Sequence, residues 1–110
     1  MAVIAGNWKM VNGPREARAF FGALQLPANA GAHELLLFPP AVSLAAAAAC
    51  PERDPRVQLG VQNIHWEDKG AFTGECSAAM ARDAGASFAL IGHSERRQLF
   101  GETDEHVARK

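Results

Sequence analysis

This 110-residue sequence has few cysteines, almost no excess of positive or negative charge, and no long apolar run. Cys50 and Cys76 form neither a CxxC pair nor a zinc-ligand spacing, so no disulfide framework or redox motif is predicted. Lys and Arg number 11 against 12 Asp and Glu, without a block of like charge, which argues against a nucleic-acid partner. The longest strongly apolar stretch, Ala45 to Ala49, is far shorter than the ~20 residues of a membrane span. The start of the chain lacks the basic region of a secretory signal. We therefore expect one cytoplasmic domain over residues 1–110, with no membrane contact.

Four apolar runs with strand character are present, at residues 2–5, 34–38, 57–61 and 87–91. Their starts lie roughly 30 residues apart, an interval that fits strand–helix–strand units and is too long for hairpins. None of the runs alternates between apolar and polar residues, as is typical of parallel strands buried on both faces.

Helical patterns occupy the intervals between these runs, at residues 14–24, 43–50, 77–84 and from 103 onward. Ser43 is predicted to cap the second helix and Thr103 the last one, and Gly85 follows the third at a position for a left-handed cap. The sequence thus predicts an α/β fold of parallel βα units. Periodicity leaves open whether the sheet is doubly wound or part of a closed barrel.

Polar residues follow the first predicted strand, at the sheet edge where parallel α/β proteins bind ligands. Asn7 and Lys9 are two residues apart, so in extended backbone they point the same way and can converge on one anionic ligand. The alternative is a solvated lysine near a turn, which is the commoner meaning of an isolated Asn-x-Lys.

His93 ends the fourth predicted strand and a helix is expected directly after it. The positive end of that helix favours a neutral imidazole, which can donate a hydrogen bond to a substrate oxygen and shuttle a proton. A histidine at a strand end is by itself more often structural. The adjoining Glu95, Arg96 and Arg97 are equally typical of a solvated salt-bridge face.

The segment at residues 63–75 is longer than a connection within a compact unit requires. Gly70 and Gly74 flank a tip that contains Phe72 and Thr73, which favours a docking loop over a phosphate-binding loop. The other histidines lack partners at metal-ligand spacing, so no metal site is predicted.

Three motifs resemble the triose-phosphate isomerase family: Ala5-Gly-Asn-Trp-Lys-Met10, Gly70-Ala-Phe-Thr-Gly-Glu75 and Ile91-Gly-His-Ser-Glu-Arg-Arg97. They occur in the family's order and are joined by Phe38-Pro39-Pro40 and Gln62-Asn63, so the resemblance covers Met1 to Lys110. The fold that it implies is a (β/α)8 TIM barrel of ~250 residues, of which this chain holds about the first four strands.

The resemblance implies a role for each of five site residues. Asn7 and Lys9 would bind the substrate, with Lys9 also catalytic, and His93 would be the neutral electrophile that moves protons through an enediolate. The family is itself the standard example of a neutral histidine working with a carboxylate base, so this role is inherited from it. Glu95 would be the partner of Lys9, and Ser94 would open the helix that acts on His93.

The resemblance also implies a homodimer and no cofactor. Thr73 would reach across the dimer interface to the neighbouring subunit's Asn7 and Lys9, and Phe72 would dock beside it. The activity implied is the interconversion of dihydroxyacetone phosphate and glyceraldehyde 3-phosphate, in glycolysis and gluconeogenesis.

The carboxylate base, the lid and the phosphate loops of such barrels belong to their second half, so we expect this half to be inactive alone. It would need a complementary second half or another copy of itself. The competing hypothesis is a non-catalytic half-barrel module that self-assembles or binds a partner through open strand edges. Another phosphate-handling barrel would give no reason for the motif from Gly92 to Arg97.

Overall fold

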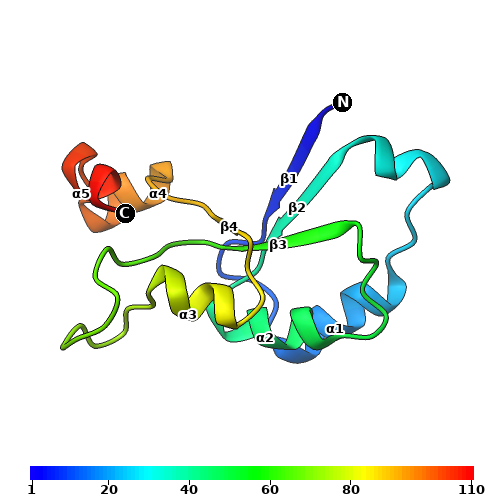
Figure 1. Cartoon of the computed structure of the whole chain (residues 1–110), viewed down its shortest axis with the longest axis horizontal. Helices are drawn as coiled ribbons and strands as arrows, with labels where there is room; N and C mark the ends of the chain where they lie inside the picture. Colours follow the sequence, from blue (N-terminus) through cyan, green and yellow to red (C-terminus); the bar gives the residue numbers. More distant parts are fainter.

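The computed structural model describes all 110 residues as a parallel sheet whose strands alternate with helices (Figure 1). The strands are β1 (Val3–Asn7), β2 (Glu34–Phe38), β3 (Val57–Val61) and β4 (Phe88–Ala89). The helices are α1 (Pro14–Ala23), the 3-10 helix η1 (Ala28–Ala32), α2 (Ala41–Ala49), α3 (Ala78–Asp83), α4 (Ser94–Phe100) and α5 (Asp104–Arg109). None of them is both long and apolar enough to cross a membrane.

The strands are hydrogen-bonded in their order along the chain, β1-β2-β3-β4, and every pair is parallel. A doubly wound sheet reverses its strand order at a switch point, whereas a barrel adds each new strand beside the last. The continuous order therefore identifies the first half of a (β/α)8 barrel, and the predicted fold class is confirmed. β1 and β4 each have a neighbouring strand on one side only.

The middle strands coincide with their predicted ranges, and the two edge strands differ from theirs. β1 extends to Asn7 because its pairing with β2 continues to Phe38. β4 has two residues in place of the predicted 87–91. Single backbone bonds from Ser87 to Leu59 and from Leu90 to Val61 continue the pairing on either side of β4.

The predicted cap of α2 is wrong. α2 begins at Ala41, directly after Pro40, so Ser43 lies inside the first turn and is fully buried. Its hydroxyl donates to the backbone carbonyl of Asn12 at 2.6 Å, which satisfies the buried oxygen and links α2 to the segment after β1. Thr103 caps α5 as predicted, and Gly85 has a φ of 110°. Ser77, which the helical spacing counted within the third helix, caps α3.

The hydrophobic core lies between β3 and the helices. Val57, Leu59 and Val61 of β3 are almost fully buried and belong to one cluster with Phe21 of α1 and Ala47 of α2. The alanines of α2 let that helix approach the sheet closely because they add little volume. Burial of these apolar side chains provides the main driving force for this packing.

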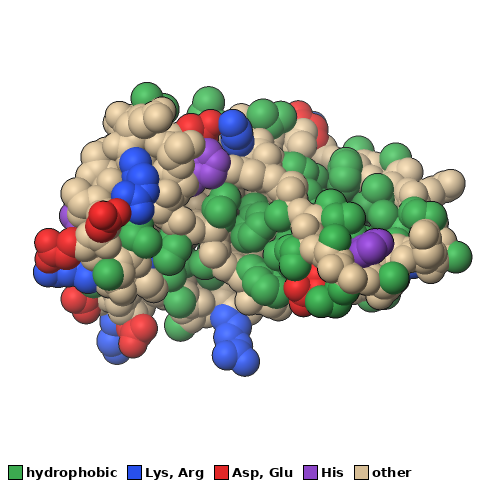
Figure 2. All heavy atoms as spheres, turned by 90° about the horizontal axis from the view of Figure 1, so that it is seen from above, with side chains coloured by type: hydrophobic (Ala, Val, Ile, Leu, Met, Phe, Trp, Pro, Cys, Tyr) green, Lys and Arg blue, Asp and Glu red, His purple; other side chains and the backbone are tan.

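Much apolar surface remains outside this core. Only 19 of the 110 residues are buried, and the radius of gyration is 14.6 Å, against about 13 Å for a compact chain of this length. Val3 and Ile4 of β1 are 58% and 54% exposed. Figure 2 shows hydrophobic side chains spread over the middle of one face without a covering layer.

A side chain at Gly60 of β3 is expected to destabilise the fold. A Cβ atom there would lie 2.4 Å from the ring of Phe38 and 2.9 Å from the carbonyl oxygen of Phe88. Gly60→Ala should therefore lower the free energy of unfolding by about 1–3 kcal/mol through overpacking. Gly22→Ala, in open space on α1, should raise it by up to about 1 kcal/mol. Urea unfolding measures both, and equal effects of the two substitutions would contradict the packing described.

Candidate active site

A tight turn at the end of β1 positions Asn7 and Lys9. The backbone N–H of Lys9 donates to Asn7 Oδ1 at 2.9 Å, and Lys9 has a left-handed φ of 55°. This conformation costs a residue with a side chain roughly 1–2 kcal/mol, and such strain is concentrated at functional sites. The two residues are thus brought together by a turn, and the extended geometry assumed from the sequence is wrong.

His93 caps the amino end of α4. Its Nδ1 accepts the backbone N–H of Glu95 at 3.1 Å. Because Nδ1 is an acceptor, the neutral ring carries its proton on Nε2, which leaves Nε2–H available as a donor. Ser94 is the first residue of α4, as expected, but the side chain that caps the helix belongs to His93.

Glu95 forms an ion pair with Lys9 across the site. Lys9 Nζ lies 2.7 Å from Glu95 Oε1, with the two side chains 55% and 42% exposed. The hydrogen bond from Lys9 lowers the pKa of Glu95 against the opposing effect of desolvation, and the charges of Lys9 and His93 lower it further. An ion pair this exposed contributes little stability, so its main effect is to orient the lysine.

These residues line one cavity of about 490 Å³ at the carboxyl ends of the strands, and its lining includes Asn7, Lys9, Gln62, His93 and Glu95. The volume is that of a small-molecule pocket. The parallel topology therefore brings the first and fourth strand ends together, as the sequence predicted. No group of three or more His, Cys, Asp or Glu side chains could hold a metal ion.

The loop between β3 and α3 projects away from the sheet (Figure 1). Thr73 is exposed at its tip, and the ring of Phe72 is 44% exposed and packs on His65 with centroids 4.3 Å apart. No hydrogen bond joins Thr73 to Asn7 or Lys9 of the same chain. The role of Thr73 and Phe72 at a dimer interface stays a prediction.

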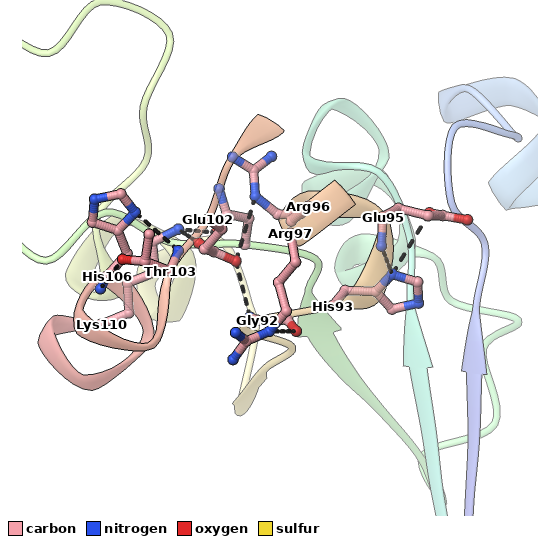
Figure 3. A network of polar contacts seen from close by, with 10 residues as sticks. Gly92, His93, Glu95, Arg96, Arg97, Glu102, Thr103, His106 and Lys110 are labelled. Atoms are coloured by element: carbon pink, nitrogen blue, oxygen red, sulfur yellow. Dashed lines mark hydrogen bonds and ion pairs between the residues drawn. The ribbon is translucent and has the colours of Figure 1, made fainter. Parts of the chain in front are cut away.

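Glu102 is a buried carboxylate that the sequence analysis did not single out. It accepts the backbone N–H of Gly92 at 3.1 Å and pairs with Lys110, whose Nζ also donates to Asn63 at 2.7 Å. Arg96 Nε lies 3.8 Å from the same carboxylate. Figure 3 shows Glu102 with Lys110 on one side of Gly92 and His93 with Glu95 on the other. The network holds Gly92, and through it the position of His93, from the side of α5.

Opposing effects act on the ionisation of Glu102. Burial by itself raises the pKa of this carboxyl, but the hydrogen bond and charge of Lys110, the charge of Arg96 and the N–H of Gly92 outweigh it, so the pKa is lowered. No local pattern marks Glu102 in the sequence, although its partners Gly92, Arg96 and Lys110 all lie within ten residues of it. Gln62 was similarly noted only as part of a motif, although its amide contacts two backbone carbonyls.

The fold and the cavity define half of a barrel protein with its ligand site at the carboxyl ends of parallel strands. The model of the triosephosphate isomerase family matches residues 2–110. The chain belongs to the triosephosphate isomerase family.

Curated relatives agree with this assignment. The triosephosphate isomerase of Bdellovibrio bacteriovorus is 44% identical over 108 residues, which cover 98% of this chain and 44% of the relative. The proteins of the same name from Picosynechococcus sp. and Synechococcus sp. are 48% and 45% identical, over 96% and 98% of this chain and 44% and 45% of their own lengths. The chain thus spans less than half the length of these relatives.

The Glu102 network predicts a pH-dependent contribution to stability. Because the pKa of Glu102 is lower in the folded chain than its ordinary 4.5, the carboxylate stabilises the fold above pH 4.5, and this stabilisation is lost as the pH falls through the lowered value. Glu102→Gln should cost about 3–5 kcal/mol at neutral pH, since it leaves Lys110 buried without its partner.

Chemical unfolding of the wild type and of Glu102→Gln at a series of pH values checks this prediction. The difference between their free energies of unfolding should be largest at neutral pH and shrink on acidification. Glu105→Gln, which breaks a pair on the surface of α5, serves as the control and should show no such trend. A difference for Glu102→Gln that does not change with pH would contradict the ionised network.

Proposed function

We propose that this chain forms the amino-terminal half of a triosephosphate isomerase site that interconverts dihydroxyacetone phosphate and glyceraldehyde 3-phosphate. The observation that carries the proposal is the convergence of Asn7, Lys9 and His93 on one cavity in a chain of this family. By analogy with the family, the remaining four βα units supply the carboxylate base and the phosphate loops.

The reaction moves one proton between adjacent carbon atoms. A carboxylate takes the proton next to the carbonyl, the electron pair moves to the carbonyl oxygen, and the proton returns to the neighbouring carbon of the enediolate. The Nε2–H of His93 is suited to donate to the oxygen that gains charge, since its Nδ1 is already an acceptor. Its neutral form can then pass protons between the two oxygens.

Lys9 and Asn7 complement this charge. The ammonium group of Lys9 is a point charge suited to the phosphate and the enediolate oxygen. Asn7 uses its Oδ1 for the turn, which leaves the two hydrogens of Nδ2 for a substrate oxygen. Both groups therefore act as donors to a negatively charged ligand.

Two carboxylates of this chain line the cavity, Glu75 and Glu95, and by analogy with the family neither of them is the base. Glu95 is the carboxylate nearest to His93, but its pairing with Lys9 lowers its pKa and so weakens it as a base. We propose that this half is inactive without the remaining units. We further propose that the completed protein works in the cytoplasm as a homodimer, in which Thr73 and Phe72 approach Asn7 and Lys9 of the other subunit.

A non-catalytic half-barrel module is the second candidate function. It is favoured by the single-sided pairing of β1 and β4 and by the exposure of Val3 and Ile4. Unpaired strand edges are templates for association with another chain. In this case the module would assemble with copies of itself, or bind an unrelated partner, without isomerase activity.

Reassembly with a second half tests the catalytic proposal. The purified 110-residue chain should convert triose phosphates at a rate near background. Activity should appear on mixing with the second half of the Picosynechococcus relative, expressed separately from the point where its match to this chain ends. Robust turnover by the chain alone would show that this half contains a catalytic base, against the proposal.

In the reassembled protein, His93→Gln should lower kcat by about 10²- to 10⁴-fold, because the proton-transferring electrophile is lost. The matched control is His33→Gln, before β2 at the opposite end of the sheet, where the side chain accepts only the N–H of Ala2; it should leave kcat unchanged. A similar loss in both variants would remove His93 from the mechanism.

Light scattering distinguishes the two candidate functions. Isomerase activity together with a new complex on mixing supports the first. A stable homo-oligomer of the chain that neither binds the second half nor gains activity supports the non-catalytic module instead.

A further inference from the structure

Lys9, whose charge is proposed to bind the substrate, has its backbone held by the side chains of Asn7 and Gln62. Lys9 lies after β1, outside any helix or strand. Its N–H donates to Asn7 Oδ1 and its carbonyl oxygen accepts from Gln62 Nε2, both at 2.9 Å. Both polar backbone groups of this left-handed residue are therefore fixed by side chains.

Gln62 uses both of its amide hydrogens at this point. Its Nε2 donates to the carbonyl oxygen of Lys9 at 2.9 Å and to that of Phe38 at 2.8 Å. Carbonyl oxygens only accept, so the nitrogen of the amide must face them. Gln62 follows β3 and Phe38 ends β2, so one side chain ties the turn after β1 to the ends of the next two strands.

The anchoring point matters because Lys9 is strained. Its left-handed backbone persists only where the surroundings determine it. Without the amide of Gln62, the carbonyl of Lys9 loses this partner and the peptide plane after Lys9 is free to rotate. The backbone of Lys9 can then leave its left-handed conformation, which redirects the side chain and the ammonium group that pairs with Glu95.

We propose that Gln62 is a positioning residue for the isomerase reaction, which acts by holding the backbone of Lys9 so that its ammonium group meets the substrate. The inference rests on the proposed function of the cavity. Gln62 acts through Lys9, so its contribution should exist only while Lys9 is present.

A double-mutant cycle in the reassembled protein tests this dependence. Gln62→Met keeps the length of the side chain and removes both donors. It should lower kcat/KM by about 10- to 100-fold, the scale of a misplaced catalytic group. In a Lys9→Met background the same substitution should lower kcat/KM by less than about 2-fold, because the group that Gln62 positions is already gone.

The matched control is Gln58→Met. Gln58 lies within β3, four residues before Gln62, and its side chain makes no hydrogen bond. This variant should leave kcat/KM unchanged in both backgrounds. If Gln62→Met does not give folded protein by circular dichroism, Gln62→Asn replaces it, since its shorter amide cannot reach both carbonyls.

The carboxyl titration of Glu95, followed by ¹³C NMR, gives a readout that does not need activity. Lys9 lowers the pKa of Glu95, so Lys9→Met should raise this pKa. Gln62→Met should also raise it, because the ammonium group of Lys9 is then no longer held against the carboxylate. A purely structural role would leave this titration unchanged while the protein stays folded.

Equal losses of kcat/KM in the two backgrounds, or an unchanged Glu95 titration in folded Gln62→Met, would overturn the inference. If the wild-type halves reassemble without isomerase activity, the proposed function fails instead. The Glu95 titration then still decides whether Gln62 positions Lys9.

Discussion

Parallel pairing of consecutive strands is the constraint on which the site depends. Each strand leaves the sheet at the same edge, so the residues after β1, β3 and β4 meet there although they are distant in sequence, as Lys9 and Gln62 are at 53 positions apart. The cavity, the turn that holds Lys9 and the cap made by His93 all lie along this edge.

Two carboxylates near His93 have different physical roles because their surroundings differ. Glu95 is half exposed and contacts Lys9 and His93, so it orients the charged groups of the cavity and adds little stability. Glu102 is buried among two cations and a backbone N–H, so its ionised form stabilises the fold. The exposed ion pair therefore orients side chains of the cavity, and the buried carboxylate stabilises the fold.

The sequence predicted what depends on neighbouring residues. The ranges of β2 and β3, the cap at Thr103 and the family motifs could be read locally, since periodicity and capping act over a few residues. The turn at Lys9 and the place of Ser43 inside α2 required the contacts between segments. The burial of Glu102 could not be predicted, because its side-chain partners Arg96 and Lys110 are charged groups that a sequence places on the surface.

The hydrogen bonds of Glu102 have a consequence for how the site is put together. They join Gly92 to Lys110, so residues 92–110 form a closed unit, in which α4 and α5 lie apart from α1 and α2 (Figure 1). This unit is joined to the rest of the chain by the short β4, by the bond from Lys110 to Asn63 and by the ion pair between Glu95 and Lys9. Trp66, in the loop after β3, also stacks on His106 with ring centroids 5.7 Å apart. The separation of His93 from Lys9 therefore depends on how residues 92–110 pack against the loops after β1 and β3, and the sheet alone does not determine it.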